Sequence, residues 1–110
     1  MKLPKGENVD LGTKLEEYVR NAAHREGRHK ARLFESVLGI TLANRELLRQ
    51  AILAAAANSD EAQPRGDNGH GAVYSLRFLL ETPKGSAVVL TAWIVRHGED
   101  FPRMTTCYIV

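Results

Sequence analysis

A run of basic residues from Gly27 to Arg32, reading Gly-Arg-His-Lys-Ala-Arg, has side chains that could bind and process a phosphate group. His29 is the histidine that adjoins this cationic run, and an imidazole can serve as a general acid or base near neutral pH. Lys30 and Arg28 would stabilise negative charge that develops on phosphorus. The run is expected to open a helix, and the helix dipole favours an anion at that end. Arg32 is a further candidate contact to the bound substrate.

The position of Lys30 on the expected helix leaves three interpretations open. At 100° per residue, Lys30 falls near the centre of the apolar stripe, above Leu33 and Phe34. An ammonium group cannot enter a core unpaired, so its side chain must reach a cleft, a sheet edge or solvent. Alternatively, Lys30 is partly buried and pairs with an acid such as Glu81 or Asp100. The whole basic run can also be an ordinary solvated surface.

A second group of candidates follows from side-chain alternation in the C-terminal half. A three-residue loop at 83–85 would place Leu80 opposite Val88 and Leu76 opposite Ala92. In that register, the face away from the core combines aromatic rings, hydroxyl groups and a cation, on Arg77, Thr91, Trp93, Thr106 and Tyr108.

These residue types are the parts of a shallow recognition surface, in which Arg77 would supply a fixed charge. For the RNA substrate that the resemblance described below implies, Trp93 and Tyr108 would stack on bases, and Thr91 and Thr106 would hydrogen-bond phosphate or ribose. A register shifted by one residue would exchange the two faces of the second strand. The alternative for Trp93 is packing beneath the segment 58–71.

The elements that must position these residues follow from the hydrophobic pattern, whose period changes along the chain from that of helices to that of strands. A first short helix is expected after Thr13, which can cap it, with Leu15, Tyr18 and Val19 on its apolar face, and residues 24–28 are expected to break it. Further helices are expected over 29–38, ended by Gly39, and over 42–57. Residues 58–71 read as a polar linker or flap, and strands are expected over 72–82, 86–96 and 103–110. The pattern predicts an α+β fold with two to three N-terminal helices packed on one face of a small, three- to four-stranded antiparallel sheet.

The composition of the chain excludes several protein classes. Its 110 residues predict a single domain spanning 1–110. One cysteine rules out an internal disulfide framework, and no Cys/His spacing suggests a metal site. No apolar run approaches a membrane span, and residues 1–6 lack the apolar core of a signal peptide, so a cytoplasmic protein without membrane association is expected. No cofactor is expected.

The same residues carry a resemblance that covers almost the whole chain. The chain is similar to a small bacterial domain of unknown function over Leu3–Asn8, Gly27–Ala31, Phe34, Leu38–Gly39, Thr91–Ile94 and Pro102–Tyr108. Such domains occur alone and as C-terminal toxin modules of contact-dependent inhibition and filamentous-haemagglutinin-type proteins. The resemblance implies a metal-independent ribonuclease of the barnase–EndoU–colicin type, acting from the open face of the sheet.

Two functional hypotheses follow. In the first, the domain cleaves RNA, with tRNA as the candidate substrate, by attack of a ribose 2′-hydroxyl on the adjacent phosphorus. This hypothesis also predicts an immunity-type protein partner or a homodimer. In the second, the chain is a non-catalytic module that binds a protein partner through Trp93 and the sheet edge, or an inactive relative of the toxin domains.

Overall fold

The computed structural model describes residues 1–12 and 25–110, and the side chains of residues 25–31 are not among the described parts. Within these ranges the helical elements are η1 (Gly6–Asn8), α2 (Arg25–Leu38), η2 (Leu42–Asn44) and α3 (Arg45–Asn58). The helix predicted after Thr13, with Leu15, Tyr18 and Val19, lies outside the described residues. No helix in the described ranges has the length and apolar character needed to cross a membrane.

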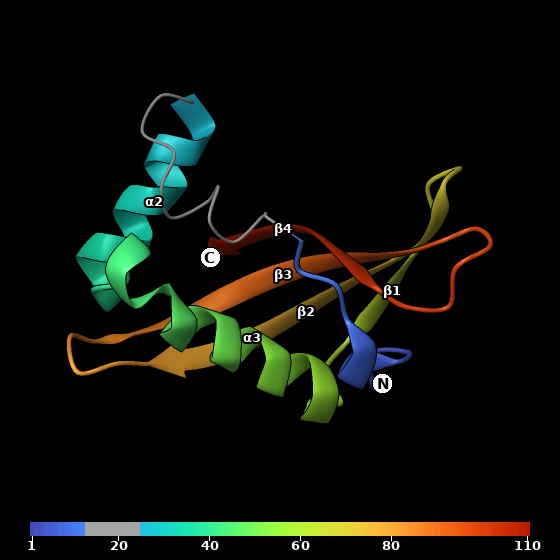
Figure 1. Ribbon diagram of the computed structural model, residues 1–110, viewed down its shortest axis with the longest axis horizontal. Helices are drawn as coiled ribbons and strands as arrows, with labels where there is room; N and C mark the ends of the chain where they lie inside the picture. The colour runs from blue at the N-terminus through green and yellow to red at the C-terminus, as the bar shows by residue number, and fades with distance from the viewer. Residues whose placement is uncertain (13–24) are drawn as a thin grey trace.

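Four strands form one antiparallel sheet in the order β1-β2-β3-β4, so each strand pairs with its neighbour in the sequence (Figure 1). The strands are β1 (Gln63–Asp67), β2 (Gly71–Glu81), β3 (Ser86–Arg96) and β4 (Arg103–Ile109). The predicted α+β class and the antiparallel sheet are therefore confirmed, and β3 has the predicted bounds.

The helix α2 begins at Arg25, four residues before the predicted start at residue 29. Gly27 therefore lies inside the helix, where a glycine costs only about 1 kcal/mol relative to alanine. The predicted end is confirmed, because Gly39 follows Leu38 with φ 69°, the left-handed conformation that glycine adopts without strain.

The segment 58–71 is not the linker or flap that its polar composition suggests. It contains β1, which pairs with β2 through Gln63 opposite Ser75 and Pro64 opposite Tyr74. Residues 68–70 make the turn, in which the backbone N–H of Asn68 donates to the carbonyl of Gly71 at 3.2 Å. The polar composition reflects an exposed edge strand, and Pro64 suits an edge because it has no N–H to donate.

The register between β2 and β3 differs by one residue from the prediction. Leu80 lies opposite Ala87 and Leu76 opposite Thr91, because the turn has two residues between Thr82 and Gly85 rather than three. The Thr82 hydroxyl donates to the carbonyl of Leu38 at 2.8 Å, which attaches this turn to the end of α2. The shift moves every β3 side chain to the face opposite to the predicted one.

One buried cluster joins the helices, the N-terminal segment and one face of the sheet. Its largest fully buried side chains include Trp93, Phe34, Leu48 and Ile52. The cluster comprises Leu3, Leu11, Phe34, Leu38, Ile40, Leu48, Ile52, Ala56, Ala62, Leu76, Leu80, Val89, Trp93, Met104 and Cys107. The other face of the sheet, which we call the open face, carries the alternate residues of β2, β3 and β4.

Candidate functional site

The open face presents two rows of side chains that cross the sheet. In one row, Ser75, Ala92 and Thr106 lie on successive strands, and Gln63 extends the row onto β1. In the next row, Arg77 lies opposite Leu90, which lies opposite Tyr108. The structure thus brings together three of the predicted site residues, namely Arg77, Thr106 and Tyr108. With strands about 4.8 Å apart, the backbones of Arg77 and Tyr108 are separated by about 10 Å.

Trp93 and Thr91 do not belong to this face, and their predicted position is wrong. Both side chains have 0% exposure, on the face that packs in the buried cluster. The indole Nε1–H of Trp93 donates to Thr91 Oγ1 at 2.8 Å, and the Thr91 hydroxyl donates to the carbonyl of Leu76 at 2.9 Å. Because every polar atom of the pair is satisfied inside the core, neither side chain can reach a base or a phosphate in this conformation.

The basic run lies on α2, but most of its side chains fall outside the described parts of the structure. Arg28, His29 and Lys30 are in the helix backbone, and nothing further is described for them. Arg32 is described and has an exposed side chain. The helix that bears these residues contacts β4, the strand of Thr106 and Tyr108.

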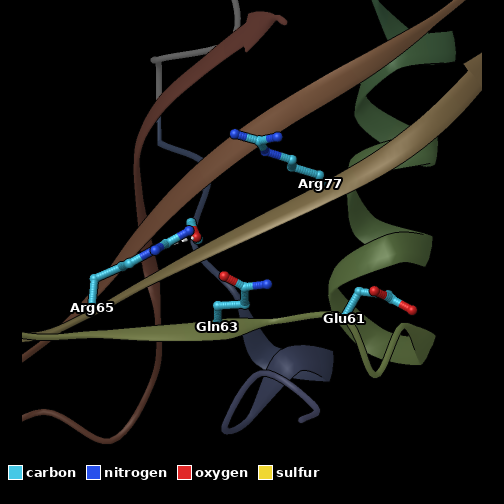
Figure 2. Close-up of a pocket in the computed structure, with 5 residues that line it drawn as sticks. Glu61, Gln63, Arg65 and Arg77 are labelled. Carbon is cyan, nitrogen blue, oxygen red and sulfur yellow. Dashed lines mark hydrogen bonds between the residues drawn. The ribbon is translucent and has the colours of Figure 1, made fainter.

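A hollow of about 240 Å³ opens on the open face between β1 and β2. Its lining consists of polar and charged side chains, namely Glu61, Gln63, Arg65, Ser75 and Arg77 (Figure 2). Arg65 Nε donates to Ser75 Oγ at 2.8 Å, which fixes the direction of the guanidinium group. In Figure 2 the side chain of Arg65 extends from β1 toward β2, that of Arg77 extends from β2 toward β3, and the Glu61 carboxylate points away from both.

The charges of the hollow are not neutralised internally. Among the ion pairs of the described residues, no carboxylate pairs with Arg65 or Arg77. Two arginines against one glutamate leave a net charge of +1 at neutral pH (2 − 1). The arrangement therefore favours an anion, and the planar guanidinium groups suit the oxygens of phosphate or carboxylate.

The far end of β1 is attached to the loop after β3. Asp67 Oδ2 and His97 Nε2 lie 2.8 Å apart, and the N–H of Gly69 donates to Asp67 Oδ1 at 2.7 Å. These two hydrogen bonds hold the pKa of Asp67 below its ordinary value of 3.8, and the one with His97 has the larger effect. They fix the β1–β2 hairpin and, with it, the strand that carries Arg65.

The described residues contain no group of three or more His, Cys, Asp or Glu side chains that could hold a metal ion. The hollow has two arginines and a single carboxylate beside one amide and one hydroxyl, a set of ligands that is not typical of a cation site. The chemistry available on the open face is hydrogen bonding and charge stabilisation of an anion.

Sequence reasoning missed Gln63 and Arg65, because it placed both in a linker. The signal for their strand is present in the sequence. Asp67-Asn68-Gly69 is a typical turn sequence, and it directly precedes the alternating residues of β2. A hairpin at that turn would have paired Arg65 with β2 and placed it beside Ser75.

Comparisons with known proteins add a fold and a family. No curated protein matches the chain. Among solved structures, a chain of the "Contact-dependent growth inhibition toxin - immunity protein complex from Klebsiella pneumoniae 342" is similar with a TM-score of 0.68 and 15% sequence identity. The match covers 93% of this chain and 98% of that chain, which shows a shared fold. A family model described as "Domain of unknown function (DUF6883)" matches residues 2–110, and the chain therefore belongs to this family.

Proposed function

We propose that this chain is a toxin-type domain that cleaves RNA by a metal-independent transesterification, with tRNA as the candidate substrate. The observation that carries the proposal is the pair of exposed arginines, Arg65 and Arg77, on the open face without a carboxylate partner among the described residues. The fold shared with a chain of a toxin–immunity complex supports a role in bacterial antagonism.

The proposed site joins the open face to the start of α2. Arg77 would bind a phosphodiester, the Tyr108 ring would stack on a base, and Thr106 would hydrogen-bond ribose or phosphate. The helix α2 packs against the buried face of the sheet, so its side chains would reach Thr106 and Tyr108 around β4, which is an edge strand that α2 contacts.

On α2, His29 would act as the general acid or base for the 2′-hydroxyl, and Lys30 and Arg28 would stabilise the phosphorane. Arg32, which is exposed, would bind the RNA at a position other than the reacting phosphate. Trp93 and Thr91 have no part in this site, because their side chains lie in the core.

Cleavage of a purified tRNA pool by the full chain tests this proposal. His29→Ala and Lys30→Ala should each reduce the initial rate at least about 100-fold, since acid–base catalysis and charge stabilisation contribute on that scale. Arg49→Ala is the matched control, because it removes a positive charge from the exposed surface of α3. Circular dichroism should show that all variants fold. Unchanged cleavage in both His29→Ala and Lys30→Ala would overturn the catalytic assignment.

A second candidate function is that of an immunity-type or other protein-binding domain. One end of the open face carries three adjoining apolar side chains, Leu79, Val88 and Val110, with exposures of 60%, 41% and 59%. Leu79 lies opposite Val88, and the N–H of Val110 donates to the carbonyl of Val88 at 2.9 Å. Exposed apolar groups of this kind often contact another protein.

Expression of the chain alone in a bacterial host separates the two candidates. Growth arrest that Lys30→Ala relieves supports the toxin-type function. Normal growth, together with protection of the host from a toxin encoded beside the chain, supports the immunity-type function. A Leu79→Asp variant that abolishes this protection, but leaves the fold intact, would assign the apolar end of the open face to the toxin contact.

A further inference from the structure

We propose that the hollow between β1 and β2 is a phosphate-binding subsite for single-stranded RNA, with Arg65 and Arg77 as its two cationic ligands. The identity of the ligand rests on the proposed function, whereas the subsite itself concerns binding and not cleavage. Neither Gln63 nor Arg65 was a candidate from sequence, so the subsite extends the open-face site onto the edge strand β1.

The guanidinium group of Arg65 is held in place before any ligand binds. Its Nε donates to Ser75 Oγ at 2.8 Å, and Ser75 lies opposite Gln63 in the β1–β2 register. One of the five guanidinium N–H groups is used in this bond, and the two NH₂ groups keep four donors. A side chain oriented in advance loses less conformational freedom on binding, which favours its use as a ligand contact.

Arg77 lines the same hollow from β2, and its side chain extends toward β3 (Figure 2). Two like charges on one hollow repel each other, and a bound anion would relieve this repulsion. The carboxylate of Glu61 does not fill this role, because it forms an ion pair with neither arginine among the described residues and points away from both. An external oxyanion would satisfy both groups at once.

A phosphodiester fits the hollow better than a planar carboxylate does. The hollow has donors on two strands, Arg65 on β1 and Arg77 on β2, and the Gln63 amide adds a neutral donor. Tetrahedral phosphate oxygens can accept from several directions, whereas a carboxylate accepts in one plane.

The surroundings of the hollow also suit an extended single strand of RNA. From the hollow, the row through Ser75 continues over the small side chain of Ala92 to Thr106. An RNA strand with a base on Tyr108 could cross there and place following phosphates in the hollow, about 10–14 Å away across two to three strand spacings.

Binding of a short 2′-O-methyl RNA, which cannot be cleaved through its 2′-oxygen, tests the subsite without relying on catalysis. Fluorescence anisotropy of a labelled hexamer gives the Kd for the wild type, Arg65→Ala, Arg77→Ala and the Arg49→Ala control over a range of salt concentrations. Each hollow variant should weaken binding about fivefold to tenfold, the loss expected for one solvent-exposed hydrogen-bonded contact. Each should also reduce the slope of log Kd against log salt by about 0.7, the value for one phosphate contact on a single strand.

The control and a conservative variant exclude a purely structural effect. Arg49→Ala removes the same charge from α3 and should leave both the Kd and the salt slope close to the wild type. Arg65→Lys keeps the charge but cannot reproduce the Nε bond to Ser75, so it should retain the salt slope and recover only part of the affinity. Emission from the buried Trp93 should stay unchanged in every variant that is folded.

Different results overturn the subsite and the proposed function. Wild-type affinity and salt slope in both Arg65→Ala and Arg77→Ala would overturn the subsite, even if the chain cleaves RNA. Absence of cleavage, with RNA binding that depends on both arginines, would overturn the catalytic proposal and support the subsite. Competition by an oligoglutamate peptide as strong as that of an RNA of equal charge would overturn the assignment to phosphate and indicate an acidic protein surface as the ligand.

Discussion

The indole Nε1–H of Trp93 donates a hydrogen bond of 2.8 Å to the hydroxyl of Thr91, two residues earlier on the same strand face. Both side chains are fully buried, and the Thr91 hydroxyl in turn donates a hydrogen bond to the carbonyl of Leu76. The chain Trp93–Thr91–Leu76 links β3 to β2 and explains why a threonine occupies a position in an apolar core. Thr91 is a structural residue here, since its hydroxyl is an acceptor and a donor at once.

Thr91→Val should destabilise the fold by about 1–3 kcal/mol, because it leaves the indole N–H without its acceptor in the core and removes the hydrogen bond to the Leu76 carbonyl at almost unchanged volume. Urea unfolding followed by the emission of Trp93, the only tryptophan, measures the effect. Thr91→Ser keeps the hydroxyl and should lose less free energy than Thr91→Val. Equal stability of Thr91→Val and the wild type would contradict the importance of this bond.

Gly6→Ala should cost about 1–3 kcal/mol, the usual range for overpacking. A Cβ at residue 6 would overlap the backbone carbonyl of Ala56, where η1 meets α3. The adjacent Lys5→Gly variant is the control, because Lys5 has φ 54° and a glycine relieves the strain of that left-handed conformation. Thermal unfolding of the two variants should therefore shift in different directions, and a loss of stability in Lys5→Gly larger than in Gly6→Ala would refute this account.

Asp67→Asn should lower stability at neutral pH, and the difference from the wild type should shrink in acid. The hydrogen bond from His97, followed by that from Gly69, holds the folded-state pKa of Asp67 below 3.8. The carboxylate therefore stabilises the folded state fully above pH 3.8, and this contribution is lost as the pH falls through the lower, folded-state pKa. Unfolding free energies of the wild type and Asp67→Asn, measured from pH 7 to pH 2.5, check this pH dependence. A difference between the two proteins that grows in acid would contradict it.

Arg103→Lys should loosen the N-terminal segment. Arg103 donates to Glu99 through Nε at 2.9 Å and Nη2 at 2.8 Å, to Asp10 through Nη1 at 3.0 Å, and lies 4.9 Å from the ring centroid of Phe101. A lysine cannot make this forked set of bonds. Hydrogen exchange at the N–H of Met104, which donates to the Asp10 carbonyl at 3.0 Å, should accelerate. An Arg96→Lys control should leave this exchange unchanged, and equal protection in Arg103→Lys would show that the backbone pairing suffices.

The candidate site illustrates what local sequence rules miss. Pro83 has a fixed negative φ and cannot enter the primed turns that two-residue hairpins prefer, so the sequence favours a three-residue loop. In the structure, no residue from 82 to 85 has a positive φ, and the two-residue turn is held by contacts with α2. Thr82 donates to the carbonyl of Leu38, and Lys84 Nζ donates to the carbonyl of Glu35 at 3.1 Å.

The periodicity of the chain by itself determined the α+β class, the bounds of β3 and the end of α2 at Gly39, because each depends on residues close in sequence. It also determined that Arg77 faces away from Leu76. Only the tertiary structure decided which face Trp93 and Thr91 occupy and that Arg65 lies beside Ser75. An alternating strand has two equivalent faces, and the choice between them depends on a turn whose length is fixed by a helix 44 residues away.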